Sequence, residues 1–259
     1  MRNPIIEESS EVFLRRPQYV RLHIGVVGVI ILFTILLWPS RGFMVFFRSE
    51  TVPAVFQAVV IFQLLLAAGV SLYIGLDRLA EAQIIKYSEW IERTALPIRV
   101  LAIGKLSSAL LHSLLIVGLG VPMVVVSAGP AGIPPGAVAS SEVVVLFTAI
   151  VCRMAGLLIS HIGETRYFTR VTGGWIFLAL LFVATVRIAP VLNPVVSVIA
   201  QHSETSALMV PGMEITFRNH PLSGPGIALG SLSIVLATLY VASLYQHRRR
   251  FRRERGGRQ

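Results

Sequence analysis

Charged side chains are scarce in this sequence. Only 14% of its 259 residues are Asp, Glu, Lys or Arg, while 54% are hydrophobic, and an ordinary soluble domain carries roughly 25% charged residues. The mean hydropathy is +0.74, and the apolar residues gather in long uncharged blocks that a bilayer can solvate and one soluble core could not bury. The scarcity of charge therefore excludes an ordinary soluble protein and predicts an integral membrane protein.

The chain also lacks the motifs of several kinds of chemistry. Its one cysteine, Cys152, excludes an internal disulfide. The sequence contains neither H-E-x-x-H nor G-x-S-x-G, and the apolar blocks contain no pair of acidic residues. The six histidines are scattered without paired spacing, so we expect no metal site.

The dipeptide Gly104-Lys105 does not belong to a phosphate-binding loop. The motif G-x-x-x-x-G-K-[ST] would require glycine where Arg99 stands and a hydroxyl where Leu106 stands. We interpret Lys105 instead as a side chain that extends its ammonium to the lipid headgroups at the start of a span. The sequence therefore predicts no nucleotide site in this chain.

Six apolar blocks have roughly the 20 residues that a helix needs to cross about 30 Å of hydrocarbon. We therefore predict an all-α, polytopic membrane protein with six transmembrane helices in a single domain, 1–259. The first twenty residues mix acids and bases, and no cleavage site closely follows the first block, so we expect this block to be retained. The blocks cover residues 22–38, 53–76, 104–127, 142–161, 173–190 and 226–245.

Lys and Arg residues alternate between the two sides of the predicted membrane. If the N-terminus is inside, 18 of the 23 basic residues lie in cytoplasmic segments and three in outer loops. Because cytoplasmic loops retain Lys and Arg, we predict that both termini are cytoplasmic. The basic tail, 246–259, follows the last block directly, which favours contact with anionic membrane lipids rather than with nucleic acid.

The segment joining the second and third blocks, about 77–95, is predicted to be an amphipathic helix on the cytoplasmic surface. Its apolar residues recur at helical spacing and its charged residues occupy the other sides. Pro97 ends or kinks this helix, because proline lacks the N–H that would continue it. The apolar positions are Leu76, Ala80, Ile84, Tyr87 and Ile91.

Three features of the sequence resemble the membrane subunit of an ATP-binding cassette (ABC) exporter of the type-2 class. The acidic helical segment ends in a Pro-hydrophobic turn, "ALPI" at 95–98, followed by Gly104-Lys105. A small-residue, Ser-containing stretch with a short basic loop occupies 155–170, and an apolar L-x-P segment, "LNPVVSVIA", occupies 192–200. The resemblance spans about 75–202.

This resemblance implies a permease subunit that hydrolyses nothing itself and holds no cofactor. It would pair with a second permease copy, as a homodimer or heterodimer, and with separate ATPase subunits that bind ATP and magnesium. The implied location is the bacterial inner (plasma) membrane. The surface helix would contact the ATPase through Glu81, Glu89, Glu92 and Arg93.

Four polar residues of the apolar blocks are singled out by their position. Arg153 lies seven residues before Ser160, about 10 Å into a span, where it is either a structural anchor or part of a substrate pathway. His112 and Gln63 are further pathway candidates, although polar side chains in spans usually bond across a helix interface. Glu142 begins the fourth block and is interpreted as a helix-start acid favoured by the helix dipole.

Two connections on the outer side carry further expectations. The Gly- and Pro-rich stretch 127–141 is predicted to be an irregular turn, and the start of the long connection 191–225 a short helix that dips into the outer leaflet. A membrane-embedded transferase or hydrolase using the outer loop 201–220 is an alternative function, and a channel or scaffold subunit is another. Turnover without ATP would favour the enzyme, and conductance that ignores nucleotide would favour the channel.

Overall fold

The computed structural model describes most of the chain. The described residues are 14–15, 17–37, 52–76, 98–162, 167–185, 193–200, 207–210, 213–216, 229–230, 232–242 and 245. Helices make up nearly all of this part, and the antiparallel hairpin β1–β2 is its only sheet. The elements are α2 (Pro17–Leu37), α4 (Val52–Leu76), α6 (Ile98–Ala128), α7 (Pro135–Ile162), α8 (Tyr167–Ala179), the π-helix η1 (Leu180–Ala184), α10 (Pro194–Ala200), β1 (Ala207–Val210) and β2 (Met213–Thr216).

Four of the helices are long and apolar enough to cross a bilayer: Pro17–Leu37, Val55–Leu76, Ile103–Ala128 and Pro135–Ser160. They coincide with the first four apolar blocks, so the chain is an integral membrane protein, as its composition predicts. Of two shorter apolar helices, Thr169–Ala184 overlaps the fifth block and Leu232–Ala242 lies within the sixth.

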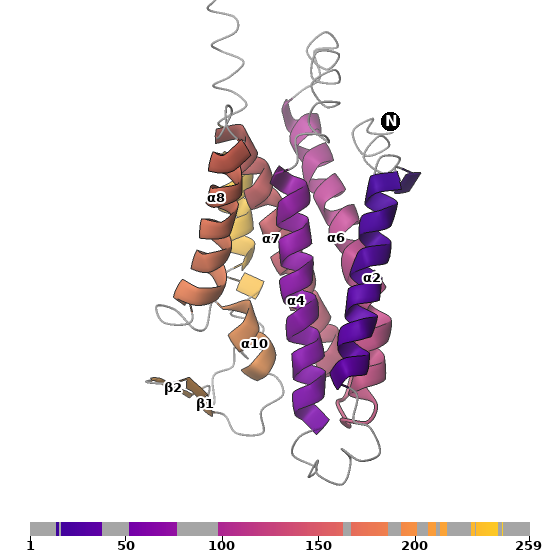
Figure 1. Ribbon diagram of the computed structural model, residues 1–259. Helices are drawn as coiled ribbons and strands as arrows, with labels where there is room; N and C mark the ends of the chain where they lie inside the picture. The colour runs from indigo at the N-terminus through magenta and orange to yellow at the C-terminus, as the bar shows by residue number, and fades with distance from the viewer. Residues whose placement is uncertain are drawn as a thin grey trace, which may run out of the picture.

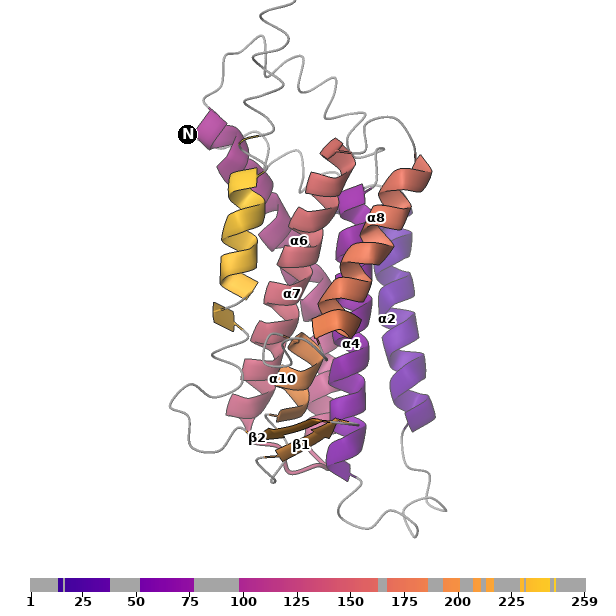
Figure 2. The same cartoon turned by 90° about the vertical axis from the view of Figure 1, so that its left-hand side faces the viewer.

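The long helices stand side by side and alternate in direction (Figure 1). Helices α2, α6 and α8 begin at one end, which we call the Pro17 end, whereas α4 and α7 begin at the opposite Pro135 end. Figure 2 shows Leu232–Ala242 near α6 and α7, and α10 with the hairpin towards the Pro135 end. The short connections from α6 to α7 and from α7 to α8 favour an antiparallel arrangement of these neighbours.

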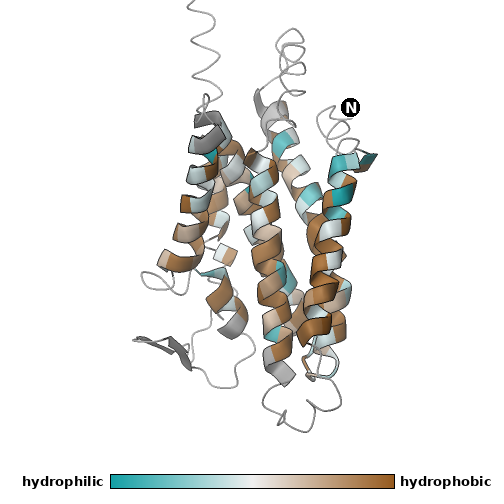
Figure 3. Ribbon diagram, in the orientation of Figure 1, coloured by the Kyte–Doolittle hydropathy of each residue, from teal (hydrophilic) through white to brown (hydrophobic). Residues whose placement is uncertain are grey.

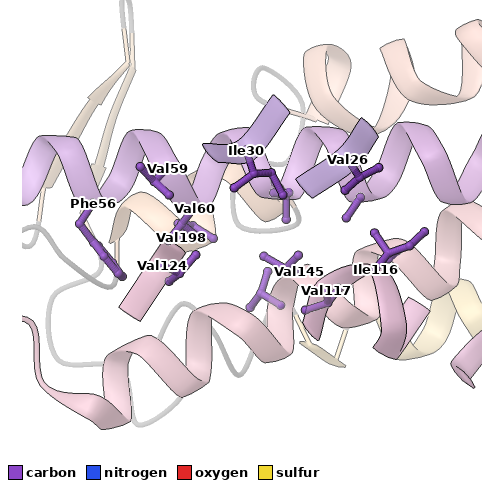
Figure 4. Packing of buried hydrophobic residues seen from close by; sticks show 14 of the residues in the cluster. Val26, Ile30, Phe56, Val59, Val60, Ile116, Val117, Val124, Val145 and Val198 are labelled. Carbon is purple, nitrogen blue, oxygen red and sulfur yellow. The ribbon is translucent and has the colours of Figure 1, made fainter. Parts of the chain in front are cut away.

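The centre of the bundle is the interface between α4 and α7. A Cβ added at Gly75 would lie 2.7 Å from the carbonyl oxygen of Arg153 and 2.9 Å from the Cα of Gly156. Because these are backbone atoms, only glycine lets the two helices approach so closely. Hydrophobic side chains from α2, α4, α6, α7 and α10 surround this centre, among them Val26, Ile30, Phe56, Val59, Val60, Ile116, Val117, Val124, Val145 and Val198 (Figure 4).

The connection between α6 and α7 differs from the prediction. The irregular turn expected over 127–141 is present but shorter, at 129–134, because α6 continues to Ala128 and α7 already begins at Pro135. Proline suits the first turn of a helix, where its missing N–H has no partner in any case. The hydroxyls of Ser140 and Ser141 donate to the carbonyl of Ala137, so these serines remain within the helix.

Asn193 joins the end of the fifth apolar helix to α10. Its Oδ1 accepts hydrogen bonds from the backbone N–H groups of Val195 and Val196, at 2.9 and 3.2 Å. Its Nδ2 donates to the carbonyl of Phe182 at 2.9 Å and to the Thr185 hydroxyl at 2.8 Å. One amide therefore caps α10 and binds a carbonyl in η1, where the π-helical turn departs from the regular hydrogen-bond ladder.

The short helix expected at the start of the 191–225 connection is confirmed as α10. Its side chains Val196, Ser197 and Val198 are buried, and the helix packs against α4 and α7. Beyond α10, the described parts of the 201–220 segment form β1 and β2, with Ala207 opposite Thr216 and Val210 opposite Met213.

Candidate functional site

Buried polar side chains lie between the helices of this apolar bundle. Most of the surface of the long helices is hydrophobic, and the polar positions on them are few (Figure 3). Gln63 and His112 are each 1% exposed, and Arg153 is 5% exposed. Polar and charged groups at such depth are costly in a membrane protein and are therefore candidates for function.

One polar cluster joins α4, α6 and α7. The Nε2 of Gln63 donates to the backbone carbonyl of Val117 and to Oε2 of Glu142, both at 3.1 Å. The interhelical bond expected of Gln63 is therefore present, and it reaches two helices. The side-chain oxygens Oε1 of Gln63 and Oε1 of Glu142 are also buried, and neither has a hydrogen-bond partner among the described residues.

Gly120 makes room for this cluster. A Cβ added there would lie 2.6 Å from Nε2 of Gln63 and 2.8 Å from its Cδ. The amide of Gln63 thus lies directly on the backbone of α6, in a position that a larger residue would occupy. The carbonyl of Val117, one turn away on α6, accepts one of its two N–H groups.

A second polar cluster lies nearer the Pro17 end. His112 on α6 contacts His23 on α2, with 3.4 Å between their Nε2 atoms, and this contact joins two helices as expected for a polar residue in a span. The charge of Arg153 on α7 acts on the same His112 ring. Arg153 is packed within protein rather than turned towards lipid, which agrees with either a structural anchor or a pathway residue.

The three pathway candidates therefore lie in the bundle interior but at two levels. His112 and Arg153 form one level, and Gln63 belongs to the other. On α7, Glu142 and Arg153 are eleven residues apart, or about 16 Å by helical rise. Along this length the interior between the helices is lined by polar groups at both levels.

The interpretation of Glu142 as a helix-start acid is wrong. Because α7 begins at Pro135, Glu142 lies about two turns inside the helix, and the first turn contains no acid. The prolines Pro134 and Pro135 were the sequence signal for this earlier start. His23 was also missed as a candidate, since it stands at the edge of an apolar block and its partner lies 89 residues away.

The predicted ATPase-contacting helix, 77–95, lies outside the described residues, and so do its candidate residues Glu81, Glu89, Glu92 and Arg93. The same holds for the basic tail, 246–259. Within the described part of the chain, no group of three or more His, Cys, Asp or Glu side chains could hold a metal ion.

Comparison with protein-family models, with curated proteins and with solved structures finds no match to this chain. The class of the protein therefore follows from its fold and its interior. It is a helical integral membrane protein whose central helices enclose ionisable and polar side chains.

Proposed function

We propose that this chain is the permease subunit of an ABC exporter of the type-2 class. In this role it moves an unidentified substrate across the bacterial inner membrane, paired with a second permease and driven by separate ATPase subunits. The proposal combines two kinds of support: the motifs at 95–105, 155–170 and 192–200, and a polytopic bundle with a polar interior.

The observation that carries the transport role is the enclosure of Arg153, His112 and Gln63 between membrane helices. A purely structural membrane bundle has no need of a buried guanidinium, because lipid-facing and interior positions can both be apolar. Polar groups along the interior give a substrate with polar parts a route that avoids hydrocarbon. A permease whose helices exchange between two arrangements would expose these groups to each side in turn.

The described basic residues support the proposed orientation. Arg15 and Arg21 lie at or before the start of α2, Lys105 lies in the first third of α6, and Arg170 lies near the start of α8. All four therefore lie nearer the Pro17 end than the Pro135 end. Because Lys and Arg are retained on the cytoplasmic side, the Pro17 end is proposed to face the cytoplasm.

The experiment that tests the proposal is capture of an ATPase subunit. The chain is co-expressed with a candidate ATPase subunit bearing a Walker A motif, then purified in detergent through a tag on this chain. We expect the ATPase to co-purify and to hydrolyse ATP. Changing Glu89, Glu92 and Arg93 together to alanine should abolish capture, because these residues are proposed to contact the ATPase.

The matched control changes Arg248, Arg249 and Arg250 to alanine, which removes three cytoplasmic charges outside the predicted contact helix. This variant should still capture the ATPase. Failure of the unaltered chain to capture it, or equal capture by both triple variants, would refute the proposed function. Turnover of a lipid-linked substrate without ATP would instead favour the membrane-embedded enzyme, and nucleotide-independent conductance the channel.

A further inference from the structure

The cluster of Gln63 and Glu142 lacks one hydrogen-bond donor for its buried oxygen atoms. The two N–H groups of Gln63 are both used, one on the carbonyl of Val117 and one on Oε2 of Glu142. Two buried acceptors remain, Oε1 of Gln63 and Oε1 of Glu142, and no described residue donates to either. Burying an acceptor without a donor is unfavourable, so two such atoms in one side-chain pair need a common explanation.

The chemistry of an amide and a carboxyl group supplies one. A carboxylic acid and a primary amide form a closed pair with two hydrogen bonds: the amide N–H donates to one carboxyl oxygen, and the acid O–H donates to the amide oxygen. The first bond is present between Nε2 of Gln63 and Oε2 of Glu142. The second would join the two oxygens that lack a donor, and it requires one proton on Oε1 of Glu142.

We infer that Glu142 and Gln63 form a proton-binding site within the membrane bundle. One proton from water forms an O–H bond at Oε1 of Glu142, changes the carboxylate into a neutral acid, and supplies the missing donor to Oε1 of Gln63. Glu142 is the proton-binding residue, and Gln63 is the positioning residue. The inference stands apart from the proposed transport function, because it concerns only the occupancy of this pair.

The surroundings of the pair favour a proton over a salt bridge. No described Lys, Arg or His contacts Glu142, whose one hydrogen bond is with Gln63. The described ionisable groups on the neighbouring elements lie towards the Pro17 end: Tyr73 on α4, Lys105 and His112 on α6, Arg153 further along α7 and Arg170 on α8. An unneutralised carboxylate here would be costly.

The position of Glu142 also leaves only a short path for a proton between water at the Pro135 end and its carboxyl group. Glu142 lies about two turns from the start of α7 at the Pro135 end, which is about 10 Å by helical rise. Its side chain is only partly buried, although Oε1 itself is covered. The pair can therefore exchange its proton with water on that side of the bundle.

Infrared spectroscopy of the purified full chain in phosphatidylcholine vesicles tests this inference. We expect the carbonyl stretch of a neutral carboxylic acid at neutral pH, shifted by exchange into D₂O and by labelling glutamate carboxyl groups with ¹³C. In Glu142→Gln this band should be absent. In Gln63→Leu it should shift or disappear, because the acid loses both its donor and its acceptor.

The matched control is Gln57→Leu, which removes an amide from the same helix that has no hydrogen bond to Glu142. This variant should leave the band unchanged. If Glu142→Gln does not fold, the ¹³C-labelled wild type, Gln63→Leu and Gln57→Leu still decide the question. Absence of a ¹³C-sensitive acid band at neutral pH, or a band that Gln63→Leu leaves in place, would overturn the proton-binding site.

Discussion

The Nε2 atoms of His23 on α2 and His112 on α6 lie 3.4 Å apart, although 89 residues separate them in the chain. Their ring centroids are 5.5 Å apart, with the planes tilted by 43°. At this separation one neutral ring can donate its Nε2–H while the other accepts, so the pair holds complementary tautomers. Much of α2 is exposed, including Ile24, Leu32 and Ile35, and this contact is a polar tie between α2 and the bundle.

The first prediction concerns the strength of that tie. Replacing His112 with leucine should destabilise the protein, because the Nε2 of His23 then loses its partner. A double-mutant cycle between His23→Leu and His112→Leu should give a coupling of about 0.6 to 1.7 kcal/mol, the range for polar pairs between membrane helices. The free energy of unfolding is measured by titrating detergent-solubilised protein with dodecyl sulfate.

Ser113 offers the control for this cycle, since it is buried next to His112 in sequence but its hydroxyl has no hydrogen-bond partner among the described residues. The substitution Ser113→Ala should be additive with His23→Leu. If the effects of His23→Leu and His112→Leu on the free energy of unfolding are also additive, the two rings do not interact.

The second prediction tests the close approach of α4 and α7. In Gly75→Ala the new Cβ meets the carbonyl oxygen of Arg153 at 2.7 Å and the Cα of Gly156 at 2.9 Å. Neither atom can move unless the helices separate, so we expect a loss of about 1–3 kcal/mol or more. Thermal unfolding followed by circular dichroism measures the effect.

On the same helix, Gly69→Ala provides a matched comparison. Nothing lies within 4 Å of a Cβ at Gly69, and alanine is favoured over glycine in a helix interior by roughly 0.5–1 kcal/mol. Gly69→Ala should therefore be neutral or stabilising. Equal unfolding temperatures for the two variants would mean that α4 and α7 do not pack at Gly75.

The contrast between these two glycines illustrates how far the sequence alone can be read. Long uncharged blocks predict the membrane helices, because hydropathy over about 20 residues reports directly on transfer into lipid. Nothing in the local sequence distinguishes Gly75 from Gly69, since the difference arises from a helix about 80 residues further along the chain. The partnership of His23 with His112 is hidden for the same reason.

Glu142 shows a different limit of sequence interpretation. Hydropathy alone places the start of the fourth helix at the first long apolar run, and Glu142 then stands at its edge. The structure instead starts α7 at Pro135, because proline and small residues form a first helical turn without adding hydropathy. Because the predicted start of the helix was seven residues too late, Glu142 was interpreted as an acid at the helix end and not as a candidate functional residue inside the bundle.

The third prediction separates the two roles of Asn193. Asn193→Asp keeps an oxygen that can accept from the N–H groups of Val195 and Val196 but loses the donor to Phe182 and Thr185. Asn193→Ala loses both roles. The lost cap in Asn193→Ala should cost about 0.5–2 kcal/mol, whereas Asn193→Asp keeps the cap but buries a carboxyl group beside the carbonyl of Phe182. Hydrogen exchange of the amides of α10 measures the cap separately from global stability.

Exchange at Val195 and Val196 should accelerate in Asn193→Ala and remain slow in Asn193→Asp. If both variants accelerate it equally, the donor side of the amide, not the cap, holds α10 in place. That result would contradict the assignment of Oδ1 as the capping atom.

The fourth prediction uses Gly120 to disturb the Gln63–Glu142 pair from the opposite helix. In Gly120→Ala the new Cβ would lie 2.6 Å from Nε2 of Gln63, so the amide must swing away and lose its bonds to Val117 and Glu142. The loss should be about 1–3 kcal/mol, because buried polar atoms are left without partners. Gly118→Ala, with nothing within 4 Å of its Cβ, should cause no such loss.

A combined variant shows whether the amide is the cause. In a Gln63→Ala background the space beside Gly120 is open, so adding Gly120→Ala should cost little, and the two substitutions should be strongly non-additive. If Gly120→Ala is equally harmful with and without the Gln63 amide, the damage arises elsewhere on α6. Non-additivity would instead show that Gly120 is needed because Gln63 lies against it, which ties this glycine to the buried acid-amide pair.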